Sequence, residues 1–157
     1  MQSKLTGDEQ LVWGGFLRTH ARLIRELDHE LRREHELPLS SYDVLTQLGS
    51  APDERMRMSE LADAVLLSRS GLTRLVDRLV SEGLIERRDC PDDARGLLAA
   101  LTPGGRELLE RARVTHHAGI RRLFFEPLDP KQRRRLAESW ERLGGAPPTA
   151  RAGAVSG

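Results

Sequence analysis

Two short helices joined by a tight turn constrain the fold of this chain more than any other feature of its sequence. They lie in the stretch MRMSELADAVLLSRSGLTRLVDRLVSEGLIERR, residues 56–88. Ser59 is placed to cap the first helix, and Ser68 or Ser70 is placed to cap a second helix that ends at Gly83. The pattern predicts a helix-turn-helix.

The second of these helices has an apolar face and a polar face. The apolar residues recur at the spacing of a helix that packs on a core: Leu72, Leu75, Val76 and Leu79. The opposite face carries Arg69, Ser70, Thr73, Arg74, Asp77 and Arg78. Arginine can donate two hydrogen bonds to a guanine, serine and threonine reach phosphates or base edges, and a helix N-terminus such as that at Ser68 attracts phosphate. This face fits a helix that reads DNA, although on this helix alone a solvated arginine-rich surface explains it as well.

The segments around this pair predict a wing and two preceding helices. LIERR and GLLAAL are short apolar segments separated by the turn-forming DCPDDAR, which predicts a β-hairpin. A proline-free amphipathic stretch predicts a long helix from about Asp8 to Glu36. The segment LPLSSYDVLTQLGSAP predicts a shorter helix that is capped at Ser40 or Ser41 and stops at Gly49.

After the hairpin the sequence predicts two more helices. Thr102 is placed to cap a helix that Pro127 ends, and Asp129 starts a last helix with a proline at its first position. Residues 144–157 almost lack bulky apolar groups and are expected to be disordered.

Charge and cysteine content bound the setting of this protein. The 25 basic and 24 acidic residues leave a net charge of +1, so any nucleic-acid surface must come from the placement of charges. Cys90 is the only cysteine, which excludes an internal disulfide and favours a reducing compartment, the cytoplasm. No segment is apolar for long enough to span a membrane, and the N-terminus lacks the apolar core of a signal peptide.

Motifs for catalysis and metal binding are missing from the sequence. It contains no phosphate-binding glycine loop, no nucleophile elbow and no paired carboxylates in an apolar setting. The histidines show no metal-ligand spacing with Cys90. We therefore expect no enzyme activity, no cofactor and no structural metal.

The segments MSELADAVLLSRSGLTRLVDRLVSEGLIERR, DDAR and LTPGGRELL resemble the MarR family of transcriptional regulators. With the flanking helices, the resemblance runs from about Leu11 to Leu143. Its most specific part is Asp93-x-Arg95, which is followed at the family's spacing by Gly105. Such a long ordered pattern is a far stronger signal than any one of its parts.

The resemblance implies a mainly α fold with a small β-hairpin wing, a winged helix-turn-helix with N- and C-terminal dimerisation helices. The implied domain spans residues 8–143. Within it, the winged lobe occupies about 40–101 and the dimerisation helices about 8–36 and 102–143. Residues 144–157 form the tail.

The resemblance also assigns roles in the wing. In the family, the arginine of the wing motif enters the minor groove and the preceding aspartate holds it, which carries onto Arg95 and Asp93. Narrow minor grooves attract arginine, although a surface ion pair that stabilises a turn is the alternative. Ala94 departs from relatives that carry a second basic residue there. Six arginines balance six acidic residues between positions 69 and 95, so we expect modest, salt-dependent non-specific affinity.

Oligomeric state and DNA partner follow from the same resemblance. Five of the six aromatic residues lie in the terminal thirds of the chain, where they can fill either one monomeric core or a dimer interface. The family favours a homodimer in which the terminal helices of both chains interlock. Two-fold symmetry would present two recognition helices to half-sites roughly 34 Å apart, so the expected partner is a palindromic double-stranded operator.

Family members are commonly repressors that a small aromatic or anionic effector releases from DNA. We expect such an effector where the dimerisation helices meet the winged lobe, near Trp13, Phe16, His20 and Tyr42, with Arg18 as an anion partner. The alternative is that Trp13 and Phe16 are interface core and His20 is a packed histidine. A different class of function also stays open, namely a protein-interaction and dimerisation module that uses the winged fold without reading DNA.

Overall fold

The computed structural model describes residues 4–65, 68–90 and 93–144, without the side chains of residues 69 and 93–95. The chain forms two compact units, of which the first ends at Ile120 and the second begins at Arg121. Among the described residues, the first unit contains five α-helices and a three-stranded antiparallel sheet. The expected class, mainly α with a small β wing, is confirmed.

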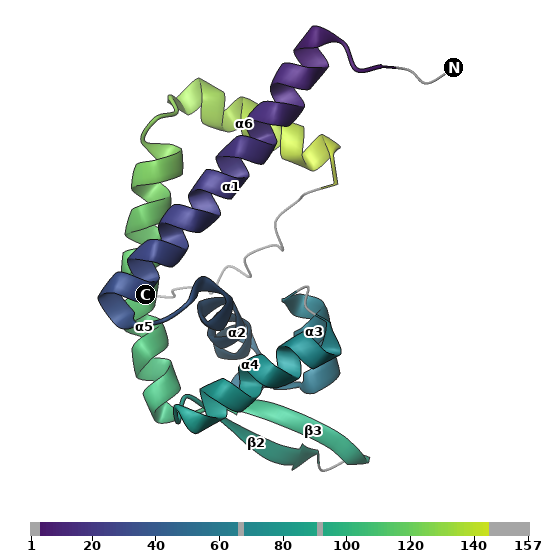
Figure 1. Ribbon diagram of the computed structural model, residues 1–157, viewed down its shortest axis with the longest axis vertical. Coiled ribbons are helices and arrows are strands. Elements are labelled where there is room, and N and C mark those ends of the chain that lie inside the picture. Colours follow the sequence, from purple (N-terminus) through teal and green to yellow (C-terminus); the bar gives the residue numbers. More distant parts are fainter. Residues whose placement is uncertain (1–3, 66–67, 91–92, 145–157) are drawn as a thin grey trace, which may run out of the picture. The chain divides into compact units, whose positions relative to one another are not determined.

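The long N-terminal helix α1 (Gly7–His35) forms as predicted. Thr6 caps it in a reciprocal capping box with Glu9. Only the C-terminal half of α1 is buried, through Leu27 and Leu31. In Figure 1 this helix lies beside α5, and the rest of the first unit gathers at one end of the pair.

Helix α2 (Leu39–Ser50) begins without a cap of its own, so the predicted capping by Ser40 or Ser41 is wrong. Both serines lie inside the helix, and Ser41 is fully buried. The first backbone N–H of the helix is instead satisfied from α1, because Asp28 Oδ1 accepts a hydrogen bond from Leu39 N at 2.8 Å. The start of α2 is therefore fixed to α1.

The wing has three strands instead of the predicted two. A short 3₁₀ turn, η1 (Pro52–Glu54), leads into β1 (Arg55–Arg57), which the sequence pattern did not reveal. The predicted hairpin consists of β2 (Ile85–Cys90) and β3 (Asp93–Leu101). Strand order is β1-β3-β2, all antiparallel. Three residues are too few to show an alternation that marks a strand.

The helix-turn-helix is formed by α3 (Met58–Ala64) and α4 (Arg69–Ser81). Ser59 lies inside α3, so its predicted capping role is wrong. Ser68 is the N-cap of α4, as predicted, and its Oγ accepts a hydrogen bond from Gly71 N at 3.1 Å.

Helix α5 (Pro103–Ile120) starts directly against the loop that follows α4. Thr102 Oγ1 accepts a hydrogen bond from Gly105 N at 3.0 Å and donates one to Gly83 O at 2.7 Å. A Cβ on Gly105 would collide with the backbone carbonyl of Leu84. The glycine of LTPGG is thus needed for a close backbone approach.

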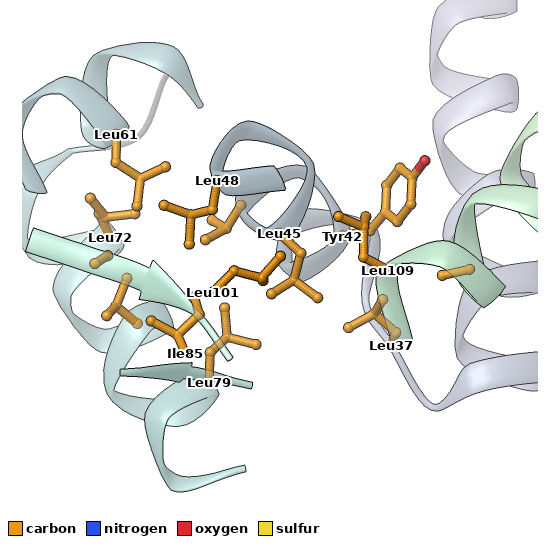
Figure 2. Packing of buried hydrophobic residues seen from close by; sticks show 14 of the residues in the cluster. Leu37, Tyr42, Leu45, Leu48, Leu61, Leu72, Leu79, Ile85, Leu101 and Leu109 are labelled. Carbon is orange, nitrogen blue, oxygen red and sulfur yellow. The ribbon is translucent and has the colours of Figure 1, made fainter. Parts of the chain in front are cut away.

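One apolar core joins the elements of the first unit, and Figure 2 shows its packing. It contains Leu37, Tyr42, Leu45, Leu48, Leu61, Leu72, Leu79, Ile85, Leu101 and Leu109. The predicted stripe of α4 is confirmed, since three of its four members are buried and Leu75 is partly buried. Each fully buried leucine contributes about 1.5–3 kcal/mol, which fixes the orientation of α4 and hence of its opposite face.

The second unit contains the π-helical turn η2 (Arg121–Phe125) and the helix α6 (Pro130–Arg142). The sequence predicted that α5 would continue to Pro127, but its regular part stops before this turn. Asp129 caps α6 as predicted. Arg133 Nη2 donates a hydrogen bond to the carbonyl oxygen of Phe125 at 2.6 Å.

Candidate nucleic-acid interface

The polar face of α4 stands opposite its buried stripe. Val76 and Leu79 are fully buried, whereas Thr73 and Arg74 are exposed. Within the described part of the chain, no hydrogen bond or ion pair holds the Arg74 guanidinium. This side chain is therefore available for bidentate donation to an external acceptor.

Arg78 lies on the same face but is tied to the protein. Its Nη2 donates a hydrogen bond of 2.7 Å to the hydroxyl of buried Ser41 in α2, and its Nε lies 3.9 Å from Glu82. Ser41 was predicted as a cap, but it shares a helix face with the core residues Val44 and Leu45, and this spacing could have pointed to a buried serine. The sequence did not indicate which side chain would satisfy its hydroxyl.

The N-terminus of α4 presents two serines. Ser68 Oγ is used as the cap, and it lies 3.4 Å from the Oγ of exposed Ser70. Free backbone N–H groups of a first helical turn favour a phosphate. The side chain of Arg69, which the sequence placed beside these serines, lies outside the described residues.

Ion pairs connect α4 to the wing. Arg87 Nη2 of β2 lies 2.6 Å from Asp77 Oδ1 of α4. Arg88 pairs with Glu86 on the same strand. Each of these two arginines therefore has a carboxylate partner within the lobe. Among the α4 arginines with described side chains, Arg78 is shared with Ser41 and Glu82, which leaves Arg74 as the one without a partner in the described chain.

The wing motif is described only by its backbone. Asp93 begins β3 and pairs with Cys90 across the hairpin, where the strand register shifts. The side chains of Asp93 and Arg95 lie outside the described residues. Their predicted ion pair therefore stays a prediction.

The residues expected around an effector lie on two different helices of the first unit, four on α1 and Tyr42 on α2. Trp13 and Phe16 lie on the N-terminal half of α1 with ring centroids 5.7 Å apart, and they are 56% and 42% exposed. Arg18 is also exposed on α1. Tyr42 is instead buried on α2, 4.5 Å from the ring of His116 in α5.

A groove of about 480 Å³ does lie between α1 and α2, and of the expected residues it includes His20. It is lined by His20, Ala21, Ile24, Arg25, Asp28, Leu39, Ser40 and Asp43. Neither aspartate was predicted from the sequence. A helix that starts without its own cap requires an acceptor from elsewhere, and this signal could have pointed to Asp28.

The two aspartates of the groove differ in their surroundings. Burial acts to raise the pKa of Asp28, but hydrogen bonds from Arg32 and from the Leu39 amide hold it below its usual value. For Asp43 burial raises the pKa. No described residue donates a hydrogen bond to the Asp43 carboxylate.

A buried polar cluster joins α2 and α5. Burial raises the pKa of Tyr42, and burial, followed by the charge of His117, lowers the pKa of His116. Among the described residues, His116 Nδ1 is buried without a hydrogen-bond partner. The neutral form of His116 is therefore favoured in the folded protein.

Other candidate groups are isolated in the structure. Cys90 is buried and unpaired at the end of β2. In the described ranges, no three histidine, cysteine, aspartate or glutamate side chains are gathered to hold a metal ion. None of the described helices has the length and apolar character required to cross a membrane.

Residues 35–96, which include the helix-turn-helix and most of the wing, match the sequence model of the MarR family. The fold is similar to that of AbsC, a MarR family transcriptional regulator from Streptomyces coelicolor. The TM-score is 0.85 and the identity 31%, over 91% of this chain and 96% of that one. A similar agreement holds for Sco3205, a MarR family regulator of the same organism whose crystal structure is a complex with DNA. There the TM-score is 0.85 and the identity 36%, over 92% of this chain and 90% of that one.

YhbI of Bacillus subtilis, an uncharacterised HTH-type transcriptional regulator, is a relative by sequence. It is 36% identical over 100 residues, which make up 62% of this chain and 61% of YhbI. The match therefore spans about three fifths of that protein.

Proposed function

This chain belongs to the MarR family of transcriptional regulators, and we propose that it binds double-stranded operator DNA sequence-specifically. The observation that carries the proposal is the outward face of α4, where Thr73 and Arg74 stand opposite a buried stripe. A helix fixed in this way between a helix-turn and a wing is the element that enters the major groove in winged-helix proteins. The DNA complex of Sco3205, at 36% identity, supports the same use of the fold.

Base reading is assigned to the centre of this helix. Arg74 and Arg78 would donate to guanine O6 and N7, and Thr73 would reach a phosphate or a base edge. The hydrogen bond to Ser41 orients Arg78 before DNA is bound, so less side-chain freedom is lost on binding.

Phosphate and minor-groove contacts are assigned to the ends of the lobe. Ser68, Arg69 and Ser70 at the N-terminus of α4 would contact the backbone, which positions the protein but carries no sequence information. Arg95, held by Asp93, would enter a minor groove beside the wing.

We infer a homodimer formed by the helical segments at about 8–36 and 102–143, with the winged lobe at about 40–101 between them. Support comes from the N-terminal half of α1, where five large apolar side chains are 42–75% exposed: Leu11, Val12, Trp13, Phe16 and Leu17. Large apolar side chains exposed together on one helix half are typical of an interaction site. A two-fold dimer would bind a palindromic operator.

The regulator is proposed to be a repressor that a small aromatic effector releases from its operator. The α1–α2 groove, to which His20 contributes, is the candidate effector site. Such an effector would bind more tightly to a conformation in which the two recognition helices are not spaced to fit DNA. Typical coupling energies between two sites would then weaken DNA binding about 5- to 150-fold.

The proposal is tested by recovering DNA fragments from the source genome with purified protein and by titrating a recovered palindrome in a gel-shift assay. Arg74→Ala should weaken binding of that duplex, and Arg111→Ala, a matched change at an exposed arginine of α5, should not. If the purified protein is dimeric but binds none of the duplexes, the result favours the protein-interaction module instead.

A further inference from the structure

The α1–α2 groove combines an apolar wall with negatively charged groups. Ala21 and Ile24 of α1 face it together with Leu39 of α2, and Ile24 is 44% exposed. The carboxylates of Asp28 and Asp43 also line it. Such a combination fits a ligand that has an apolar body and one charged end.

The charges of the groove are unequally satisfied. Asp28 accepts hydrogen bonds from Arg32 Nε at 2.6 Å and from Leu39 N at 2.8 Å, so its charge is already used. Arg25 Nε lies 3.7 Å from Glu26 Oε1, so the charge of Arg25 already has a carboxylate partner. Asp43 has no such partner in the described part of the chain. The Asp43 side chain is exposed to solvent, so the groove offers one accessible negative charge that no described residue neutralises.

We propose that this groove binds an organic cation with an apolar, preferably aromatic, body, and that Asp43 is the anionic partner of the cation. The inference rests on the proposed effector-regulated function and names the class of its effector. The sequence suggested an anionic effector with Arg18 as its partner. Arg18 does not line the groove, so the effector proposed here has the opposite charge. A second negative charge beside Asp43 would be repelled, whereas an ammonium group gains a charge-assisted hydrogen bond.

The groove also touches the element that orients α4. Leu39 and Ser40 in its wall belong to the first turn of α2, directly before Ser41, whose hydroxyl holds Arg78. A ligand that displaces this turn therefore acts on a hydrogen bond to the recognition helix. This places ligand binding and DNA binding on one connected set of contacts.

The inference is tested by calorimetric titration of the full-length protein with 3-phenylpropylammonium and with 3-phenylpropionate, two probes with a similar body and opposite charge. The ammonium is expected to bind more tightly than the carboxylate. Asp43→Asn should weaken the ammonium about tenfold or more. The matched change Asp63→Asn, at an exposed aspartate of α3, should leave it unaffected. Ile24→Ala should weaken the ammonium through its apolar body.

Three results would overturn the inference: tighter binding of the carboxylate, binding of neither probe into the millimolar range, or an ammonium affinity that Asp43→Asn does not change. Operator binding by the wild-type protein without any probe is measured in parallel. If the wild-type protein binds its operator but does not bind 3-phenylpropylammonium, only this inference is wrong. If operator binding itself is missing, the proposed function falls, whatever the probes do.

Discussion

Removing the Ser41 hydroxyl should destabilise this protein through an arginine on another helix. Ser41→Ala deletes the acceptor of the 2.7 Å hydrogen bond from Arg78 Nη2. A hydrogen bond to a charged group contributes about 1.5–3 kcal/mol when its partners cannot find water. The side chain of Arg78 is 46% exposed, so its guanidinium can be rehydrated and the expected cost is about 1–2 kcal/mol.

The reverse change has a different physical cost. Arg78→Ala leaves the hydroxyl of Ser41 unsatisfied in a fully buried position, which costs about 1–3 kcal/mol. The double variant loses both partners together. Its cost should therefore be smaller than the sum of the two single costs, by about 1 kcal/mol or more.

The assay is urea unfolding of the three variants and the wild type at one protein concentration, because the stability of a dimer depends on concentration. Arg74→Ala is the matched control, since an exposed arginine without partners in the described chain should change stability by only about 0.5 kcal/mol. Strictly additive costs for Ser41→Ala and Arg78→Ala would refute the reasoning that this bond fixes α4 to α2.

Three further predictions concern the wing, the dimer and pH. Arg95→Ala should weaken binding to many duplexes alike and reduce the salt slope by about one unit, and a wild-type slope in salt titrations would contradict its assignment. Replacing both Trp13 and Phe16 with Asp should give monomers or aggregates in light scattering, because these exposed rings lie on the proposed interface; an intact dimer would place the interface elsewhere. Since burial lowers the pKa of His116 in the folded state, the unfolded chain takes up the proton first, and stability should fall as pH drops below about 6.5. His116→Gln should reduce that loss in urea unfolding more than His117→Gln does, and equal effects would contradict it.

Local sequence signals predicted the elements that carry strong periodicity or capping. The stripe through Leu72 and Val76, the cap at Ser68 and the start at Pro103 are each decided within one or two helical turns, so the sequence alone was sufficient. The three-residue β1 was not predictable in this way. It exists because β3 offers it an antiparallel edge, which is a property of the folded sheet.

The site shows the same division between local and tertiary causes. The exposure of Thr73 and Arg74 follows from the helical period. That Arg78 would be held by Ser41, 37 positions earlier, depends on how α2 crosses α4. The capping of α2 by Asp28 likewise depends on the packing of two helices, which displaced the local choice of a serine cap.

The central claim, that the outward face of α4 reads operator DNA, is tested most directly by fluorescence anisotropy of a recovered palindromic duplex with wild-type protein and with Arg74→Ala. Arg74→Ala is expected to cost about 1–3 kcal/mol of binding free energy at the cognate sequence and less at a scrambled one, with an unchanged unfolding midpoint. Equal affinity of the two proteins for the cognate duplex would contradict it.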